Sequence, residues 1–304
     1  MKRTAHCYLD SATGATLDAW FAPEKLETPT RDCLAQKAGL IHSTSVTVEL
    51  LDFATPPGSV EDVYLRLHLL SECKVRPNEI NLDGMFALLP NVAWTSAGPV
   101  LPERVVELRA RLEDAQHHLA IPAVDKIPRM TDYIVPPGVR IGDADRVRLG
   151  AHLAPGTTVM HEGFVNFNAG TIGAAMIEGR VTPGVIVDEG SDIGAGSSIM
   201  GTLSGGGRRV NSVGKRSLLG ANGGIGISLG DDCVVEAGLY VTAGTKVTLH
   251  SGAVVSAREL SGKDGLLFRR HSQTGAVEAV SSQGSSWRGL NQDLHAAPPE
   301  TTAT

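Results

Sequence analysis

The stretch that decides the fold of this 304-residue chain is VGKRSLLGANGGIGISLGDDCVVEAGLYVTAGTKV, residues 213–247. An aliphatic residue occupies every sixth position, first in the run Val213, Leu219 and Ile225 and then in the run Leu229, Val235, Val241 and Val247. A period of six fits neither the 3.6-residue period of a helix nor the two-residue alternation of strands in a hairpin sheet. It indicates short strands separated by corners, with one large side chain pointing inward from each strand.

The same period extends upstream to residue 141. The earlier repeat positions, all aliphatic except Thr171, are Ile141, Val147, Leu153, Val159, Val165, Thr171 and Ile177 and then, after a step of four, Val181, Val187, Ile193 and Ile199. The position four residues after each of them is usually small, and several repeats place Gly directly after the aliphatic residue. Three such strands close a coil of about eighteen residues. We therefore predict a parallel β-solenoid rather than an ordinary glycine-rich sheet; the period does not fix the hand of the coil.

The charge balance limits the partners of the chain. It carries 33 acidic and 27 basic residues, a formal charge of −6, and so has no general electrostatic attraction for nucleic acid or an anionic membrane. No apolar run resembles a signal sequence or reaches a membrane-spanning length. The four cysteines are far apart and lack zinc-finger spacing, so we interpret them as reduced thiols. We expect a cytoplasmic protein with no nucleic-acid and no membrane partner.

Residues 1–130 have the pattern of a mixed α/β domain. A capping box formed by Ser59 and Asp62 predicts a helix over 60–74, which Pro77 prevents from continuing. Alternation predicts a strand over 45–50, and a short helix is expected between Thr30 and Gly39. No catalytic constellation is evident in this region.

A second helix is predicted to begin at Pro102, because proline is favoured in a first turn. Its apolar stripe extends from Val105 to Leu119, and Pro122 ends it. With the solenoid placed over 131–257, the last part of the chain, 258–304, becomes a C-terminal extension with a flexible end.

Several segments carry a specific resemblance. They are MIEGR (176–180), IMGTLSGGG (199–207), LGAN (219–222) and LGDDCVVEAGLY (229–240), with YLRLHLLS (64–71) and NLDG (81–84) nearer the N-terminus. These closely resemble the tetrahydrodipicolinate N-succinyltransferases of the actinobacterial type, within the hexapeptide-repeat acyltransferases. The resemblance implies a mainly β fold, a left-handed parallel β-helix with an N-terminal α/β domain and a short C-terminal extension.

The resemblance also implies a reaction. The family transfers succinyl from succinyl-CoA to the amine of L-2-amino-6-oxopimelate, the hydrated form of tetrahydrodipicolinate, in lysine and diaminopimelate biosynthesis. It implies a homotrimer that acts on small molecules at sites between neighbouring solenoids. The chemistry requires an acceptor for the amine proton, a donor for the oxyanion, and cations or clustered donors for the carboxylates and phosphates.

Glu178 lies where the period of six slips between Ile177 and Val181. A position where a regular repeat loses its spacing is a candidate for a functional residue. Position alone favours a solvated surface glutamate, but the matching Glu-Gly-Arg motif reverses that preference. By resemblance Glu178 is the catalytic residue, either as general base or as a nucleophile that forms an acyl anhydride.

The donor groove follows partly from the repeat. If Ile193, Leu219 and Val235 are the middle members of their coils, the alanines two residues later stack at one corner and leave room for a thin pantetheine arm. By resemblance the succinyl-CoA contacts are Arg180, Ala195, Ser198, Ala221, Glu236, Ala237, Gly244, Ser256, Arg269 and Arg270. Arg180 suits the succinyl carboxylate because its guanidinium is a bidentate donor. The cations of the tail, which include Arg258 and Lys263, suit the CoA phosphates. At Ser256 the relatives carry a lysine, which weakens that assignment.

The acceptor site is less defined. Val213 comes fourteen positions after Ile199, a step of more than two repeats, which predicts an extruded loop over the acceptor pocket. The candidates for the acceptor's carboxylates are Asn222 and Lys215, together with Arg208 and Arg209.

A metal site is also implied by the resemblance. Asp145 and Glu162 are seventeen residues apart, about one coil, and in a trimer the carboxylates of three chains would converge and favour Mg²⁺ or Ca²⁺. His152 and His161 suggest a rival, the zinc carbonic anhydrases that share this fold. That rival needs three histidines, and only two are suitably placed.

Two alternative functions remain at this point. An acetyltransferase would keep the fold and use acetyl-CoA, for which the charge of Arg180 has no purpose. A non-catalytic trimeric scaffold would need neither the break at Glu178 nor the cationic tail.

Overall fold

A computed structural model describes residues 1–22, 32–113, 118–204, 209–283 and 289–290. The chain divides into two compact units. One consists of Met1–Leu69 and Asn78–Ile134, and the other of Leu70–Pro77 and Val135–Thr304. Among the described residues, no helix is long and apolar enough to cross a bilayer.

The first unit contains two small antiparallel sheets. One has the order β2-β1-β3, with β1 Lys2–Asp10, β2 Thr16–Phe21 and β3 Ile41–Glu49. The other has the order β5-β4-β6, with β4 Val92–Thr95, β5 Gly98–Val100 and β6 Ala123–Asp125. The helices are α1 Leu34–Lys37, α2 Val60–Ser71, α3 Met85–Leu88 and α4 Val105–Glu113, with 3-10 turns at Pro102–Arg104 and Met130–Asp132. The last two residues of α2 belong to the second unit.

The predicted helix over 60–74 is present as α2 and is shorter at its end. The Ser59 Oγ accepts a hydrogen bond from the Asp62 N–H at 3.2 Å, as the capping motif requires. The helix ends at Ser71 because Cys73 adopts a left-handed φ of 55° and its N–H bonds the Leu70 carbonyl. The termination therefore occurs before Pro77 is reached.

The other local predictions are met in part. The strand predicted over 45–50 is present up to Glu49 as the end of the longer β3, and α1 ends before Gly39, while Thr30 lies outside the described residues. The prediction that the second helix continues to Leu119 is wrong, since residues 118–120 are not helical. Ala120 is instead tied to the β4–β5 turn by two hydrogen bonds with Ser96, which an α-helix could not accommodate.

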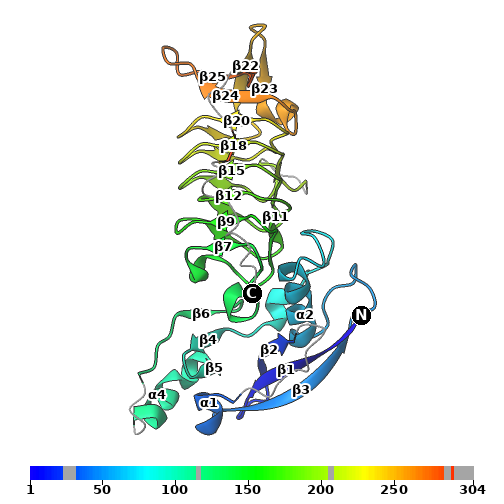
Figure 1. The fold of residues 1–304 in the computed structure, drawn as a ribbon, viewed down its shortest axis with the longest axis vertical. Helices are drawn as coiled ribbons and strands as arrows, with labels where there is room; N and C mark the ends of the chain where they lie inside the picture. The colour runs from blue at the N-terminus through cyan, green and yellow to red at the C-terminus, as the bar shows by residue number, and fades with distance from the viewer. Residues whose placement is uncertain (23–31, 114–117, 205–208, 284–288, 291–304) are drawn as a thin grey trace, which may run out of the picture. The chain divides into compact units, whose positions relative to one another are not determined.

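The second unit is a parallel β-solenoid, as the six-residue period predicted. Figure 1 shows β7, β9, β12, β15, β18 and β20 one above another. This side of the coil comprises β7 Arg140–Ile141, β9 Thr158–Val159, β12 Met176–Ile177, β15 Asp192–Ile193, β18 Leu218–Leu219 and β20 Val234–Val235. The second side comprises β10 Phe164–Val165, β13 Arg180–Val181, β16 Ser198–Ile199, β19 Gly224–Ile225 and β21 Tyr240–Val241. The third comprises β8 Ala151–Leu153, β11 Ala169–Thr171, β14 Ile186–Val187 and β17 Ser212–Val213.

The core of the solenoid consists of the residues of the repeat. Every repeat position from Val147 to Val247 is buried, with Ile177, Ile193 and Leu219 at 0% exposure. Ile141 at the start is half-buried and Ala253 at the end is exposed. Burial of this continuous aliphatic column is the main favourable term for stacking the coils.

The last turns of the solenoid and the C-terminal extension continue one side of the coil. These parts contain β22 Lys246–Leu249, β23 Val254–Ser256, a 3-10 turn at Ala257–Leu260, β24 Leu266–Arg270 and β25 Val277–Ser281. Strand β24 pairs in parallel with β20, and Phe268 next to Val235 is 1% exposed. An aromatic side chain thus covers the open end of the aliphatic column.

Candidate active site

One corner of the solenoid brings together most of the predicted donor residues. This corner, called the Glu178 corner below, comprises the turns that follow β12, β15, β18 and β20. Strand register places Ile177, Ile193, Leu219 and Val235 in one column. The turns then stack, since the Asn222 N–H bonds the Ala195 carbonyl and the Gly238 N–H bonds the Ala221 carbonyl, both at 2.8 Å. Ala195, Ala221 and Ala237 therefore follow one another up this corner, as the repeat predicted.

Glycine allows these turns to approach closely. A Cβ at Gly194 would lie 2.7 Å from the Ala221 nitrogen, and one at Gly220 would lie 2.6 Å from the Ala237 nitrogen. Asn222 adopts a left-handed φ of 55°, a conformation that asparagine tolerates. Its presence in the corner is thus explained by the turn alone, although its exposed side chain is available to a ligand.

Glu178 occupies a shortened turn of the same corner. Only residues 178 and 179 separate β12 from β13, whereas 194–197 separate β15 from β16. The N–H groups of Glu178 and Gly179 both donate to the Ile193 carbonyl, at 2.8 and 3.0 Å. Gly179 is required because a Cβ there would lie 2.2 Å from the Ser197 Oγ. This short turn is the physical origin of the phase slip, and it leaves the Glu178 side chain half-buried.

Asp192 is a residue that the sequence reasoning missed. It lies on β15 opposite Met176, and it is half-buried. Burial, and after it the charge of Glu178, raise the pKa of the Asp192 carboxyl to about 6. The available signal was a charged residue among Met176, Leu218 and Val234, the apolar neighbours of Asp192 in the outward column.

Arg180 and Ser198 are neighbours on the second side of the coil. They pair in register across β13 and β16, and the Ser198 Oγ accepts hydrogen bonds from Arg180 Nε at 3.1 Å and Nη2 at 2.8 Å. The arginine is exposed at the start of β13, directly after the Glu178 turn. Its guanidinium therefore lies beside the corner where the donor groove is expected.

The remaining donor candidates lie near the last turns. The Glu236 carboxylate accepts a hydrogen bond from the Arg270 N–H at 2.7 Å and so attaches β24 to the Glu178 corner. Arg269 forms an ion pair with Glu278 at 3.2 Å. Gly244 is exposed with open space around its α-carbon, and the Ser256 Oγ donates to the Ala243 carbonyl at 2.5 Å. Ser256 thus opens the 3-10 turn at Ala257–Leu260 and has a structural role of its own.

Lys215 is not brought together with Glu178 within one chain. It precedes β18, whereas the Glu178 corner follows that strand. Its N–H bonds Asp231 at 2.8 Å, and the neighbouring Arg216 forms a bidentate pair with Asp232 at 2.7 Å for each bond. In the predicted loop, Thr202 pairs antiparallel with Val210 and the Leu203 N–H bonds the Arg209 carbonyl, whereas Arg208 lies outside the described residues.

The two metal candidates are both exposed. Asp145 lies in the 3-10 turn Ala144–Arg146, and Glu162 follows β9. The bridge between Val147 and Val165 places them about one coil apart. Within the described part of a single chain, no group of three or more His, Cys, Asp or Glu side chains could hold a metal ion.

The two histidines of the zinc rival have different surroundings. His152 is buried, and its Nδ1 lies 2.9 Å from the Thr171 carbonyl. His161 is exposed at a corner after β9. The buried ring is therefore engaged in the solenoid itself.

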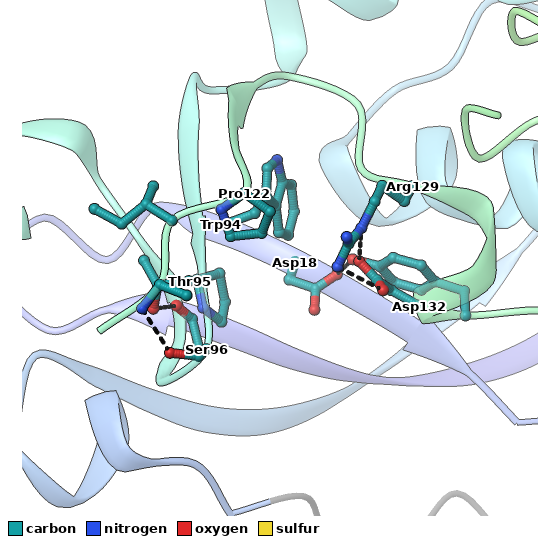
Figure 2. A pocket seen from close by; sticks show the side chains of 12 residues that line it. Asp18, Trp94, Thr95, Ser96, Pro122, Arg129 and Asp132 are labelled. Atoms are coloured by element: carbon teal, nitrogen blue, oxygen red, sulfur yellow. Dashed lines mark hydrogen bonds and ion pairs between the residues drawn. The ribbon is translucent and has the colours of Figure 1, made fainter. Parts of the chain in front are cut away.

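A pocket of about 610 Å³ lies in the first unit. Its lining includes Asp18, Trp94, Ser96, Arg129, Asp132 and Tyr133 (Figure 2). The polar groups in it bind one another: Tyr133 donates to Asp18 at 2.6 Å, and Arg129 pairs with Asp132 at 3.0 Å. None of the predicted site residues lines this pocket, so we place the chemistry on the solenoid.

Comparisons with protein families match part of the first unit and part of the solenoid. A family described as the middle region of tetrahydrodipicolinate N-succinyltransferase matches residues 89–129. A family described as the hexapeptide repeat of succinyl-transferase matches residues 210–243.

Individual relatives extend the match over most of the chain. Proteins of Pseudomonas aeruginosa and Pseudomonas paraeruginosa are each 57% identical over 245 residues, and one of Vibrio cholerae is 55% identical over 246 residues. Each alignment covers 79% of this chain and 71% of the relative, and all three relatives are named 2,3,4,5-tetrahydropyridine-2,6-dicarboxylate N-succinyltransferase. A crystal structure from Campylobacter jejuni, titled a putative 2,3,4,5-tetrahydropyridine-2-carboxylate N-succinyltransferase, superposes with a TM-score of 0.81 at 33% identity. That superposition covers 93% of this chain and 92% of the other.

Proposed function

Because the chain belongs to the tetrahydrodipicolinate N-succinyltransferase family, we propose that the Glu178 corner is its active site. The chain is an acyltransferase that moves succinyl from succinyl-CoA to the amine of L-2-amino-6-oxopimelate in lysine and diaminopimelate biosynthesis. The observation that carries the site is the position of Glu178, in the same corner as Ala195, Ala221 and Ala237 and directly before Arg180.

Glu178 serves the step in which the amine attacks the thioester. The amine nitrogen must lose a proton as it forms the amide bond, and a half-buried carboxylate beside the donor groove supplies the acceptor. The alternative role, in which Glu178 attacks first and carries succinyl as an anhydride, uses the same position. Mass analysis after mixing with succinyl-CoA alone separates the two roles, because only the anhydride route adds a succinyl group to the peptide that contains Glu178.

Succinyl-CoA is held along the corner and the start of the second side. Arg180, placed by Ser198, binds the succinyl carboxylate, and the small residues Ala195, Ala221, Ala237 and Gly244 admit the pantetheine arm. Arg269 and Arg270 take the phosphates, and Glu236 supports them by holding the Arg270 backbone. Ser256 contributes by donating to the Ala243 carbonyl, next to Gly244.

The acceptor is held by Asn222 from the same chain and Lys215 from a neighbouring one. Lys215 lies at the opposite end of β18 from the Glu178 corner, so it reaches an active site only if a second solenoid packs against the first. We therefore propose a homotrimer of left-handed coils with sites between the chains. The corresponding division of the chain is 1–130, 131–257 and 258–304, and the separation of a compact unit at Ile134 supports the first boundary.

A Mg²⁺ or Ca²⁺ ion on the trimer axis is part of this proposal. Asp145 and Glu162 are exposed oxygen ligands, about one coil apart, and one chain supplies too few of them. They fit a site completed by three copies, where the ion would neutralise carboxylates that otherwise repel one another. The residues of the Glu178 corner perform the transfer independently of this ion.

The experiment that tests the function is thiol release from succinyl-CoA or acetyl-CoA, with and without tetrahydrodipicolinate, for the wild type and Glu178→Ala. Release that requires both succinyl-CoA and the acceptor, and that is lost in the variant, supports the proposal. Glu189→Ala is the matched control, because Glu189 is an exposed glutamate on another corner. Thiol release from acetyl-CoA alone would overturn the assignment of succinyl-CoA as the donor. No release from either thioester would favour the non-catalytic trimeric scaffold.

A further inference from the structure

One carboxylate interrupts an apolar stretch of a column on the outer face of the solenoid, and beyond Met176 this column continues to Thr158 and Arg140. Strand register places Met176, Asp192, Leu218 and Val234 one above another. Met176 and Val234 are 5% and 8% exposed, and Asp192 between them is half-buried. No described residue donates a hydrogen bond to the Asp192 carboxylate or forms an ion pair with it. A half-buried carboxylate without a donor raises the free energy of the folded state. A residue that destabilises the fold in this way indicates a functional role.

The strand pairing places Asp192 beside Glu178. Met176 lies directly opposite Asp192, and Glu178 follows Met176 by two residues. Glu178 begins the short turn that follows β12, and its charge acts on the Asp192 carboxyl, so the two carboxylates lie within electrostatic range of each other. The Glu178 N–H bonds the Ile193 carbonyl at 2.8 Å, which fixes the two chain segments against each other. The arrangement is therefore set by backbone hydrogen bonds and does not depend on flexible loops.

Glu178 is the charged group to which Asp192 responds. Strands β12 and β18 on either side carry no charged residue. The corner before β15 carries Asp188 and Glu189, and the one before β18 carries Lys215 and Arg216. Arg216 is engaged by Asp232. The causes that raise the pKa of Asp192 are burial and the charge of Glu178.

We propose that Asp192 is a positioning residue for succinyl transfer, acting through Glu178 so that the two carboxylates accept the proton of the attacking amine as a pair. This inference rests on the proposed function, with Glu178 as the proton acceptor. Two ionised carboxylates at close range repel each other, and one proton between them relieves the repulsion. The pair is therefore a better proton acceptor than a single solvated carboxylate, and its double charge attracts the ammonium form of the acceptor.

The bonds and protons of the step balance. The amine nitrogen forms a bond to the thioester carbonyl carbon, and its N–H proton passes to the carboxylate pair. The C–S bond then breaks with its electron pair on sulfur. The thiolate takes up a proton, which leaves the amide and free CoA.

The test is the pH dependence of kcat/KM for succinyl transfer by the wild type and Asp192→Asn. We divide the kcat/KM of the wild type by that of Asp192→Asn at each pH. The ionisation of the substrate amine affects both values equally and therefore cancels in this ratio. We expect a ratio near 1 below pH 5 that rises to roughly tenfold above pH 7, less than the effect of losing the proton acceptor itself. The midpoint should lie near pH 6, where the Asp192 carboxyl ionises. A ratio that does not change with pH would overturn the proposal.

Two further variants and one stability measurement complete the design. Asp192→Glu keeps the charge and should retain most of the activity, and Asp188→Asn, on the preceding corner, should have the wild-type pH profile. Asp192→Asn should unfold at or above the wild-type temperature at pH 8. A lower unfolding temperature together with a constant ratio would mean that Asp192 serves the fold alone. If Glu178→Ala is fully active, the proposed function fails first; if Glu178→Ala is inactive while Asp192→Asn behaves as the wild type, only this inference fails.

Discussion

Arg180 donates from both Nε and Nη2 to the single Oγ of Ser198, one coil further along the solenoid. One hydroxyl thereby fixes one edge of the guanidinium. The opposite edge, with the second terminal nitrogen, faces away from Ser198 and can bind a carboxylate. Because the pair is made between hydrogen-bonded strands, its geometry is set by the fold.

The first prediction concerns selectivity between acyl donors. Ser198→Ala should reduce kcat/KM for succinyl-CoA by about 5- to 10-fold, because the arginine loses its support, a loss of about 1–1.4 kcal/mol. Activity with acetyl-CoA should hardly change, since acetyl has no carboxylate. Steady-state assays with both donors measure this, with Ser212→Ala as a control on another side of the coil. An equal loss for both donors would contradict a role in recognising the carboxylate.

The second prediction concerns the proton acceptor. Glu178→Gln should lower kcat by about 10²- to 10⁴-fold, because the amide cannot accept a proton from the amine. The KM for succinyl-CoA should stay within about twofold to threefold, since the turn and its two hydrogen bonds to Ile193 are backbone features. Initial rates and isothermal titration with succinyl-CoA measure the two effects. Loss of binding with unchanged turnover would place Glu178 in the donor groove only.

The third prediction concerns stability and pH. The pKa of Asp192 is raised from 3.8 to about 6 on folding, so folding is favoured while the carboxyl is protonated and this advantage is lost as pH rises through 6. Asp192→Asn should match the wild type in stability near pH 4 and exceed it above pH 7, by about 1–2 kcal/mol after allowance for solvent screening. Chemical denaturation across this pH range measures the difference. If Asp192→Asn is less stable than the wild type at pH 8, the predicted direction of the stability difference is wrong.

The fourth prediction concerns the shortened turn. Gly179→Ala would place a Cβ 2.2 Å from the Ser197 Oγ and 2.9 Å from the Gly194 carbonyl oxygen. We expect a loss of about 1–3 kcal/mol in stability and a larger relative loss of activity, because the turn positions Glu178. The double variant with Ser197→Gly should recover part of the stability. If Gly179→Ala unfolds at the wild-type temperature, the turn is less constrained than the contacts indicate.

The sequence alone determined the solenoid, the stacked alanines and the position of the phase break. These features repeat locally, and an aliphatic residue that recurs every six positions can be buried in only one arrangement. The MIEGR motif likewise singled out Glu178, because it matches the family at the residue where the period slips.

Tertiary structure alone decided which residues face one another between coils. Partners in the Ile177 column are 16, 26 and 16 residues apart, because the corners differ in length. Sequence spacing therefore did not reveal that Asp192 lies beside Glu178, that Glu236 holds the Arg270 backbone, or that Lys215 lies at the other end of its strand. Tertiary contacts also decided that residues 118–120 are not helical, since the hydrogen bonds between Ser96 and Ala120 hold this segment although an apolar stripe favoured a longer helix. Local periodicity fixes how each coil folds, whereas the contacts that give the site its charge depend on how unequal turns stack.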